Sequence, residues 1–289
     1  MISGIFPVQL PDNTRMNPPE PQAVETSSDP ERRFGGVARL YGETALGIFR
    51  RAHVCVIGIG GVGSWAVEAL ARSAIGQITL IDLDHVAESN INRQLHALDD
   101  TFGRAKVDVM AERVRQINPE CRVNSVEDYL GLDNLGELLD GNYDYVIDCV
   151  DSFRVKAALI AWCKRNKIRL VTIGGAGGQT RPALITTADL GNTEHDALLS
   201  RTRKLLRQDY GFPKNPKRRF DIPCIYSREQ PVFPADDGGV CHEKPQTAGI
   251  GGLNCAGGLG SVMTVTASFG LHAVAHVLGK LQGGEKQPE

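Results

Sequence analysis

The chain has 289 residues, of which 42% are hydrophobic and 23% charged, values that are usual for a globular protein. Its net charge of −2 gives no sign that the chain as a whole attracts a polyanion, although a local basic patch could still do so. No two of the seven cysteines are spaced as C-x-x-C, so we expect no zinc site. The odd cysteine count and the lack of a signal peptide favour a reducing, cytoplasmic location.

Both ends of the chain lack a pattern of secondary structure. Residues 1–30 hold six of the fifteen prolines and are expected to be disordered, and 283–289 is expected to be a loose tail. Residues 250–278 contain no Asp, Glu, Lys or Arg and are long enough to cross a bilayer. This stretch has six glycines and two histidines, so a buried helix is favoured, and membrane association remains the minority alternative.

The middle of the chain alternates between two periodicities. A leading helix is predicted over 34–51. Strands are predicted at 53–59, 77–84, 121–126, 143–150 and 168–175, and helices between them at 62–75, 103–118, 132–140 and 153–167. Such alternation predicts an α/β fold with a doubly wound, mostly parallel sheet that binds its ligand at the carboxyl ends of the strands. We assign 31–175 to this nucleotide-binding core.

The alternation stops after residue 175. The rest contains a predicted strand within 182–190, a charged helix at 196–208, a loop-rich stretch at 222–245 and a helix at 259–279. We expect 176–282 to be a substrate-facing extension that packs on the same sheet.

The first strand runs into a glycine-rich turn, "VCVIGIGGVG", whose glycines are Gly58, Gly60, Gly61 and Gly63. A helix follows, so free backbone N–H groups and the helix dipole would favour a phosphate there. Proteins that bind NAD, FAD, ATP or S-adenosylmethionine all share this pattern, and the glycines alone do not choose among them.

Polar residues after the strands narrow the choice. Asp82 ends the second strand, where a carboxylate could hold the ribose of NAD or of ATP. Other polar residues follow at strand ends or just beyond them: Asp84, Asn90, Arg93, Gln94, Lys106 and Asp151. Hydride transfer needs few cations near its cofactor, whereas phosphoryl or nucleotidyl transfer needs several. The set therefore favours ATP chemistry over a dinucleotide-dependent oxidoreductase.

The motifs "GIGGVGSWAVEALARSAIGQITLIDLDHVAESNINRQ", "GRAKVDV" and "YVIDCVDS" resemble those of the adenylating enzymes of the ubiquitin-activating type. The resemblance implies ATP and Mg²⁺ as cofactors. It also implies that Asp82 binds the ribose, that Asn90, Arg93 and Lys106 bind the phosphates, and that Asp151 binds the metal. The alternative hypothesis is that the chain adenylates a ubiquitin-like sulfur-carrier protein.

The predicted leading helix bears on whether the chain forms a dimer. In the family it commonly carries R-Y-x-R-Q, whose second Arg enters the active site of the other subunit. The corresponding segment of this sequence is "RRFGGVARLYG". Arg33 matches the first Arg of the motif, Gly36 stands in place of the second Arg, and Arg39 follows one turn later. We expect a homodimer, with Arg33 or Arg39 as the candidate for this role.

Further motifs, "RRFGGVARLYGETAL", "GGAGGQ", "CIYSREQPVFP" and "NCAGGLGSVMTVTASFG", resemble one subfamily over about 33–280, the tRNA threonylcarbamoyladenosine dehydratases. The resemblance implies ATP-dependent activation of the threonine carboxylate of N6-threonylcarbamoyladenosine in tRNA. The nucleoside would then cyclise with net loss of water. It also raises a cysteine desulfurase or its sulfur-acceptor protein as a possible partner.

Two cysteines and one basic stretch remain. Cys255 and Cys241 lie in polar or glycine-rich loops. Either could be a nucleophile, Cys255 being favoured, or a free loop thiol. The stretch 201–220 has eight Lys or Arg and one acid, with Tyr210, Phe212 and Phe220 between them. This composition favours tRNA phosphate contacts with base stacking. The tRNA-binding candidates are Arg201, Arg203, Lys204, Arg207, Lys217, Arg218 and Arg219.

Overall fold

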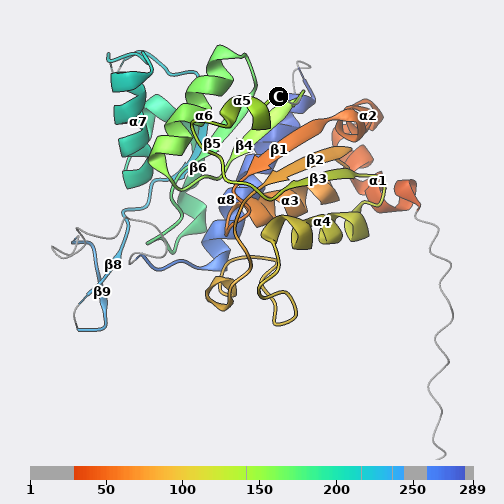
Figure 1. Cartoon of the computed structure of the whole chain (residues 1–289), viewed down its shortest axis with the longest axis horizontal. Coiled ribbons are helices and arrows are strands. Elements are labelled where there is room, and N and C mark those ends of the chain that lie inside the picture. Colours follow the sequence, from red (N-terminus) through yellow and green to blue (C-terminus); the bar gives the residue numbers. More distant parts are fainter. Residues whose placement is uncertain (1–28, 141, 216, 236, 244–258, 284–289) are drawn as a thin grey trace, which may run out of the picture.

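The computed structural model of the chain describes residues 29–140, 142–215, 217–235, 237–243 and 259–283, and a seven-stranded sheet forms its centre (Figure 1). The strand order is β3-β2-β1-β4-β5-β7-β6. The strands are β1 (His53–Ile57), β2 (Gln77–Ile81), β3 (Arg122–Val126), β4 (Tyr145–Asp148), β5 (Leu170–Ile173), β6 (Ile185–Asp189) and β7 (Pro223–Ser227). All neighbouring pairs are parallel except β6 with β7. The predicted doubly wound, mostly parallel sheet is confirmed.

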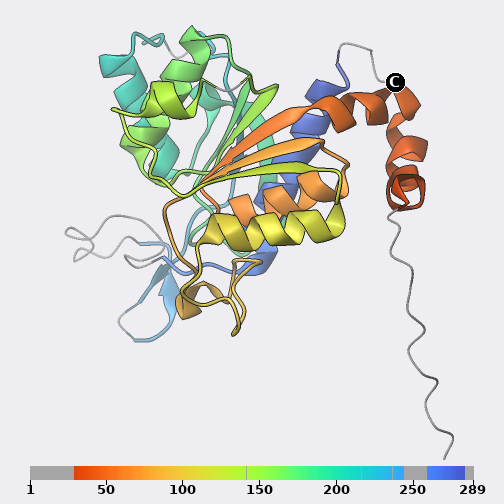
Figure 2. The ribbon, with the colours of Figure 1, turned by 45° about the vertical axis from the view of Figure 1, so that its right-hand side comes forward.

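Helices cover both faces of the sheet (Figures 1 and 2). One face packs against α3 (Gly63–Arg72), α4 (Lys106–Ile117) and α8 (Met263–Leu281), and the other against α5 (Leu135–Leu138), α6 (Phe153–Arg165) and α7 (Ala197–Asp209). Strand β1 shows why two layers form, because alternate residues face opposite sides. Val54 and Val56 belong to the first core, whereas Cys55 and Ile57 belong to the second.

The leading segment is two helices, so the prediction of a single helix over 34–51 is wrong. Helix α1 spans Pro30–Tyr41 and α2 spans Glu43–Arg51. Gly42 separates them with a φ of 88°, a conformation that favours glycine and turns the chain between the helices. The Asp29 side chain caps α1, so the helix begins at Pro30, within the segment expected to be disordered. Residues 1–28 lie outside the described residues.

The second half extends the sheet instead of only packing on it. The stretch expected to be loop-rich, 222–245, contains β7, which lies between β5 and β6. The expected boundary at residue 175 therefore falls within the sheet. A small hairpin follows, formed by β8 (Phe233–Pro234) and β9 (Val240–Cys241). Short 3-10 turns occur at η1 (Glu88–Asn90), η2 (Pro182–Leu184) and η3 (Leu190–Asn192).

The uncharged stretch at 250–278 forms α8 over its later part, and its residues 250–258 lie outside the described residues. One side of α8 is buried through Val265, Phe269 and Val277, which join the core that it shares with α3. In the described part of the chain, no helix combines the length and the apolar character needed to cross a membrane.

Candidate nucleotide site

The glycine turn lies between β1 and α3, and each of its positions requires or accepts glycine for a different structural reason. Gly58 has a φ of 88°, and a Cβ there would lie 2.9 Å from the carbonyl oxygen of Cys149. At Gly63 a Cβ would overlap the carbonyl oxygen of Gly58. At Gly61 it would lie 3.2 Å from Cγ of Arg93. A Cβ at Gly60 would meet, apart from its chain neighbours, only Nε2 of Gln94 among the described residues, at 3.9 Å. The backbone at Gly60 is therefore the part of the turn most open to a ligand.

Asp82 joins the ends of β1 and β2. Its carboxylate accepts hydrogen bonds from the backbone N–H of Ile59, at 2.5 Å, and of Asp84, at 2.8 Å. Burial raises the pKa of Asp82, and the nearby Lys106 opposes this by favouring the ionised form. The carboxylate thus fixes the first residues of the glycine turn while it lies at the strand ends, where a ribose would be bound.

Lys106 is the first residue of α4 and is almost fully buried, with a side chain 6% exposed. Its ammonium lies 2.8 Å from Oδ2 of Asp84, whose own side chain is largely exposed. The backbone N–H of Lys106 also donates to the carbonyl of Asp84. These two contacts hold a buried positive charge close to Asp82.

The segment after β2 brings three more predicted residues to this edge. Asn90 is buried, and its Oδ1 accepts from the N–H of Ala87. The Arg93 guanidinium donates to the carbonyl of Ser89 at 2.7 Å. Gln94 is 6% exposed, and its Oε1 has no hydrogen-bond partner within the described residues. A buried amide oxygen without a partner is costly, which favours a bound hydrogen-bond donor at this position.

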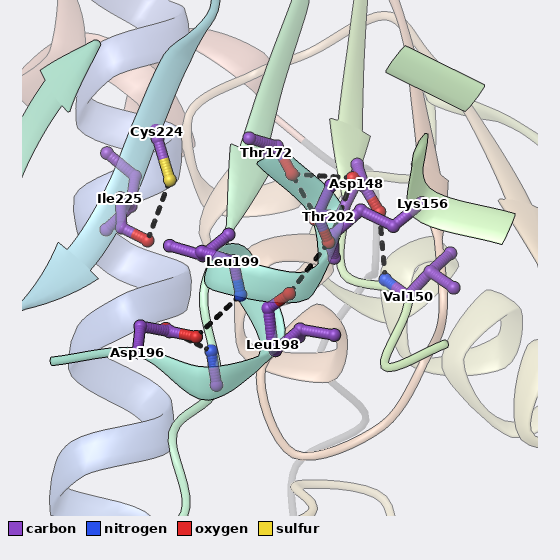
Figure 3. Close-up of polar contacts among 11 residues, drawn as sticks. Asp148, Val150, Lys156, Thr172, Asp196, Leu198, Leu199, Thr202, Cys224 and Ile225 are labelled. Atoms are coloured by element: carbon purple, nitrogen blue, oxygen red, sulfur yellow. Dashed lines mark hydrogen bonds and ion pairs between the residues drawn. The ribbon is translucent and has the colours of Figure 1, made fainter. Parts of the chain in front are cut away.

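Asp151 lies beyond the strand that it was expected to close. Strand β4 ends at Asp148, and Asp151 is exposed in the turn before α6. Sequence reasoning missed the buried pair behind it: Lys156 lies 2.8 Å from Asp148, and both side chains are 0% exposed (Figure 3). Lys156 interrupts the apolar part of α6, and that lone charge was the available signal. Because Asp148 also accepts from the N–H of Val150, the pair fixes the chain that leads to Asp151.

A second buried carboxylate extends this cluster to α7. Asp196 caps α7 by accepting from the N–H of Leu199 at 2.8 Å (Figure 3), and it accepts from the N–H of Gly175 at the same distance. Burial raises its pKa, which the charge of Lys156 partly offsets. The start of α7 is therefore tied to the carboxyl end of β5, at the same edge of the sheet as the glycine turn.

Comparison with known proteins agrees with this geometry. The profile of the ThiF family matches residues 36–288. The chain belongs to the ThiF family. It is 54% identical to the tRNA threonylcarbamoyladenosine dehydratase of Escherichia coli K12, over 86% of this chain and 93% of that protein. It is 51% identical to the enzyme of the same name from Haemophilus influenzae, over 87% and 94%.

A solved structure extends the similarity of this ThiF-family chain to three dimensions. The crystal structure of the E. coli tRNA N6-threonylcarbamoyladenosine dehydratase in complex with ATP matches it with a TM-score of 0.77 and 50% sequence identity. The match covers 87% of this chain and 94% of that one. The resemblance seen in the sequence motifs is confirmed.

In the basic stretch of this ThiF-family protein, residues 201–220, some of the predicted RNA-binding side chains are buried or hydrogen-bonded within the chain and others are exposed. Phe212 and Phe220 are buried and pack edge to face with ring centroids 5.0 Å apart, so the expectation that they stack on RNA bases is wrong. Arg203 donates to Oγ1 of Thr193, and Arg207 donates to the carbonyl of Pro213. The exposed candidates are Arg201, Lys204, Lys217, Arg218 and Arg219.

The remaining candidates of the ThiF-family chain fall in three places. Cys255 lies outside the described residues. Cys241 is half-buried in β9, with Sγ 3.3 Å from the carbonyl oxygen of Glu243. Arg33 and Arg39 are both exposed, but only Arg33 has hydrogen-bond partners among the described residues, the carbonyls of Gln116 and Ile117 at the end of α4. The Arg33 guanidinium is therefore held by contacts within its own chain.

In the part of the chain that the structure covers, no group of three or more His, Cys, Asp or Glu side chains is placed to hold a metal ion. Asp151 offers a single exposed carboxylate. Because Mg²⁺ usually takes one or two carboxylates and completes its shell with phosphate oxygens and water, Asp151 fits a metal that arrives with a nucleotide.

Proposed function

We propose that this chain uses ATP to activate the threonine carboxylate of N6-threonylcarbamoyladenosine in tRNA, after which the nucleoside cyclises with net loss of water. The observation that carries the proposal is the open backbone at Gly60, which lies next to the side-chain amide nitrogen of Gln94 and at the same edge of the sheet as the buried ammonium of Lys106. This arrangement suits a triphosphate, and it occurs in a chain similar over most of its length to dehydratases of that name.

The residues at this edge have complementary roles in the proposal. Asp82 accepts from the ribose hydroxyls, and the glycine turn with Asn90 and Gln94 holds the phosphates. Lys106 and Arg93 stabilise the negative charge that develops on the α-phosphate. Because Asp84 and the protein interior fix the ammonium of Lys106, little reorganisation is needed during the reaction.

The chemistry needs two steps. First, a carboxylate oxygen attacks the α-phosphorus of ATP and pyrophosphate leaves, which forms an acyl adenylate. Second, the carbamoyl group of the same nucleoside attacks the acyl carbon, loses a proton and expels AMP. Both groups belong to one threonine, and such intramolecular reactions can reach effective molarities of about 10⁵ M or more. A thioester on Cys255 or Cys241 is therefore not required.

Mg²⁺ is the divalent ion in the proposal, and Asp151 is the residue that would hold it. When bound, the ion neutralises charge on the triphosphate. The buried Asp148–Lys156 pair fixes the backbone at Val150, so it also limits where the Asp151 carboxylate can lie.

A homodimer is part of the proposal. The solvent-facing side of α8 has no Asp, Glu, Lys or Arg between Thr264 and Gly279. Its residues there are Thr264, Ser268, Leu271, His272, Ala275 and Gly279. An uncharged, partly apolar helix face of this length supports contact with a second copy. The exposed Arg39 is then the candidate that reaches the other subunit.

Two further expectations belong with the proposal. The six described cysteines are free, which suits a reducing cytoplasm. A sulfur-acceptor protein stays a prediction from the sequence resemblance, and co-elution of the purified acceptor with this chain would test it.

Mass spectrometry of tRNA nucleosides tests the reaction. Incubation of the chain with ATP and tRNA that carries N6-threonylcarbamoyladenosine should convert this nucleoside to a product lighter by one water, with formation of AMP. Omission of ATP is the control. ATP–pyrophosphate exchange that appears only with a small protein ending in Gly-Gly would instead indicate an adenylating enzyme for a carrier protein.

A further inference from the structure

Two guanidinium groups lie over one aromatic ring at the start of α6. The Cζ atom of Arg154 is 5.6 Å from the centroid of the Phe153 ring, and the Cζ atom of Arg201 is 5.8 Å from it. Phe153 is half-buried and both arginines are exposed. No carboxylate lies within ion-pair distance of either arginine among the described residues. The cluster therefore presents two unneutralised positive charges around a ring.

This cluster lies at the same edge of the sheet as the glycine turn. Phe153 follows Asp151 by two residues, at the carboxyl end of β4. Arg201 lies in the second turn of α7, whose start Asp196 ties to Gly175 at the carboxyl end of β5. The sequence could not show this proximity, because the two arginines are 47 positions apart and are joined only by the packing of α6 on α7.

The other end of the basic stretch lies at the opposite edge. Arg219 lies 3.8 Å from Asp189, and Asp189 pairs with Pro223, the first residue of β7. Strand β7 runs parallel to β5, so its first residue is at the amino edge of the sheet. Helix α7 has 13 residues, which spans about 20 Å. Of the basic stretch, the start of α7 therefore lies at the edge that holds the glycine turn, whereas Arg219 lies at the opposite edge.

We propose that Phe153, Arg154 and Arg201 form an RNA-binding cluster that holds an unpaired nucleotide beside the nucleoside to be activated. The inference rests on the proposed function and names where its substrate is held. Unpaired bases stack on aromatic rings and on guanidinium planes, and arginines pair with phosphates. The cluster offers all three kinds of interaction, whereas a duplex stem would not expose a base face to Phe153.

Binding of a synthetic anticodon stem-loop that carries N6-threonylcarbamoyladenosine tests the cluster. The full-length Arg154→Ala/Arg201→Ala variant should raise its Kd by about 5- to 100-fold, a range typical of the removal of base stacking. It should reduce the log–log salt slope by about 0.7 for each phosphate that the variant no longer binds. The Kd for ATP should stay unchanged, because the glycine turn is a separate site.

A matched control lies on the same helix. Arg165→Ala removes an exposed arginine at the far end of α6, whose Cζ lies 6.0 Å from the ring centroid of Tyr210. This variant should bind the stem-loop as the unmodified chain does. Phe153→Leu should weaken binding and Phe153→Tyr should restore it. Thermal melting checks that each variant is folded, and the two exposed arginines carry the test if Phe153→Leu is not.

Three outcomes would overturn the cluster. One is a stem-loop Kd for the double arginine variant within twofold of the unmodified chain. A second is a parallel rise in the Kd for ATP, which would assign the arginines to the triphosphate. The third is an equal loss of affinity in Arg165→Ala, which would indicate general charge attraction. Conversion of the nucleoside by the unmodified chain reports on the proposed function separately, because it does not depend on any variant.

Discussion

The Asp82 carboxylate both holds the backbone of the glycine turn in place and, in the proposed function, binds the ribose of ATP. Its carboxylate accepts from the backbone of Ile59 in the glycine turn and from that of Asp84 after β2. Its place after a buried strand could be predicted from the sequence. The bond to Ile59 could not, because it depends on how closely β1 and β2 approach.

Replacing Asp82 separates these roles. Asp82→Ala should weaken ATP binding strongly and should lower the free energy of unfolding by about 1–3 kcal/mol, because two backbone N–H groups lose their acceptor. Asp82→Asn keeps one acceptor oxygen and should recover part of the stability. Calorimetry with ATP and urea denaturation measure the two effects. Tighter binding of NADH than of ATP by the unmodified chain would reject the nucleotide assignment.

His96 is a buried residue that sequence reasoning did not single out. It is 2% exposed, and neither ring nitrogen has a partner within the described residues. Burial, aided by the charge of Lys106, lowers its pKa to about 4. The folded protein therefore holds this imidazole neutral at pH values where the unfolded chain, with a pKa of about 6.5, would protonate it.

The pH dependence of stability follows from this difference. The contribution of neutral His96 is fully present above pH 6.5 and is lost as the pH falls toward 4, because the unfolded state then binds the extra proton. A difference of about 2.5 pKa units corresponds to about 3 kcal/mol. Urea denaturation at several pH values between 7 and 4 should show the free energy of unfolding of the unmodified chain falling by this amount relative to that of His96→Leu. Parallel curves would show that His96 does not titrate in this way.

At the scale of elements, the sequence predicted the regular alternation of strands and helices but missed the break at Gly42 and the short strand β7. The strands from 53 to 173 and their helices were predictable, because β1, β2, β4 and β5 are buried on both faces of the sheet and the helices between them alternate apolar and polar sides. The break at Gly42 was missed because both flanking helices share one periodicity. Strand β7 was missed because "PCIYS" is short and follows a basic, proline-containing stretch. Its place in the sheet depends on pairing with β5 and β6.

The buried pair between β4 and α6 gives a prediction at this scale. Lys156→Met leaves Asp148 charged and unpaired in the core, which should lower the free energy of unfolding by about 3–5 kcal/mol. Adding Asp148→Asn removes that charge, and the amide can still accept from Val150 and donate to Thr172, the present partners of the carboxylate. The double variant should therefore be more stable than Lys156→Met alone. Urea denaturation of the three proteins measures this, and purely additive losses of stability would contradict it.

For the whole molecule, the two edges of the sheet divide the work of binding a large RNA. The carboxyl edge holds the glycine turn, Asp151 and the start of α7. The amino edge holds Arg219, whose guanidinium lies 3.7 Å from Asp221 and 3.8 Å from Asp189. The basic composition of 201–220 could be predicted from the sequence, but its division between the edges could not, because α7 carries the chain across the sheet. A whole tRNA can reach both edges, whereas a short stem-loop held at the carboxyl edge reaches only one.

Reversing two charges at the amino edge tests this division. Arg218→Glu/Arg219→Glu should weaken the binding of full-length tRNA and flatten its salt dependence by roughly 0.7–0.9 in log–log slope for each phosphate that is no longer neutralised. The affinities for ATP and for the anticodon stem-loop should not change, because both ligands bind at the opposite edge. Arg218→Lys/Arg219→Lys keeps the charges and should retain most of the tRNA affinity. Filter binding across a range of salt concentrations measures all three proteins. An unchanged affinity of the reversed variant for full-length tRNA would show that these exposed arginines only face solvent and that the tRNA binds along another path.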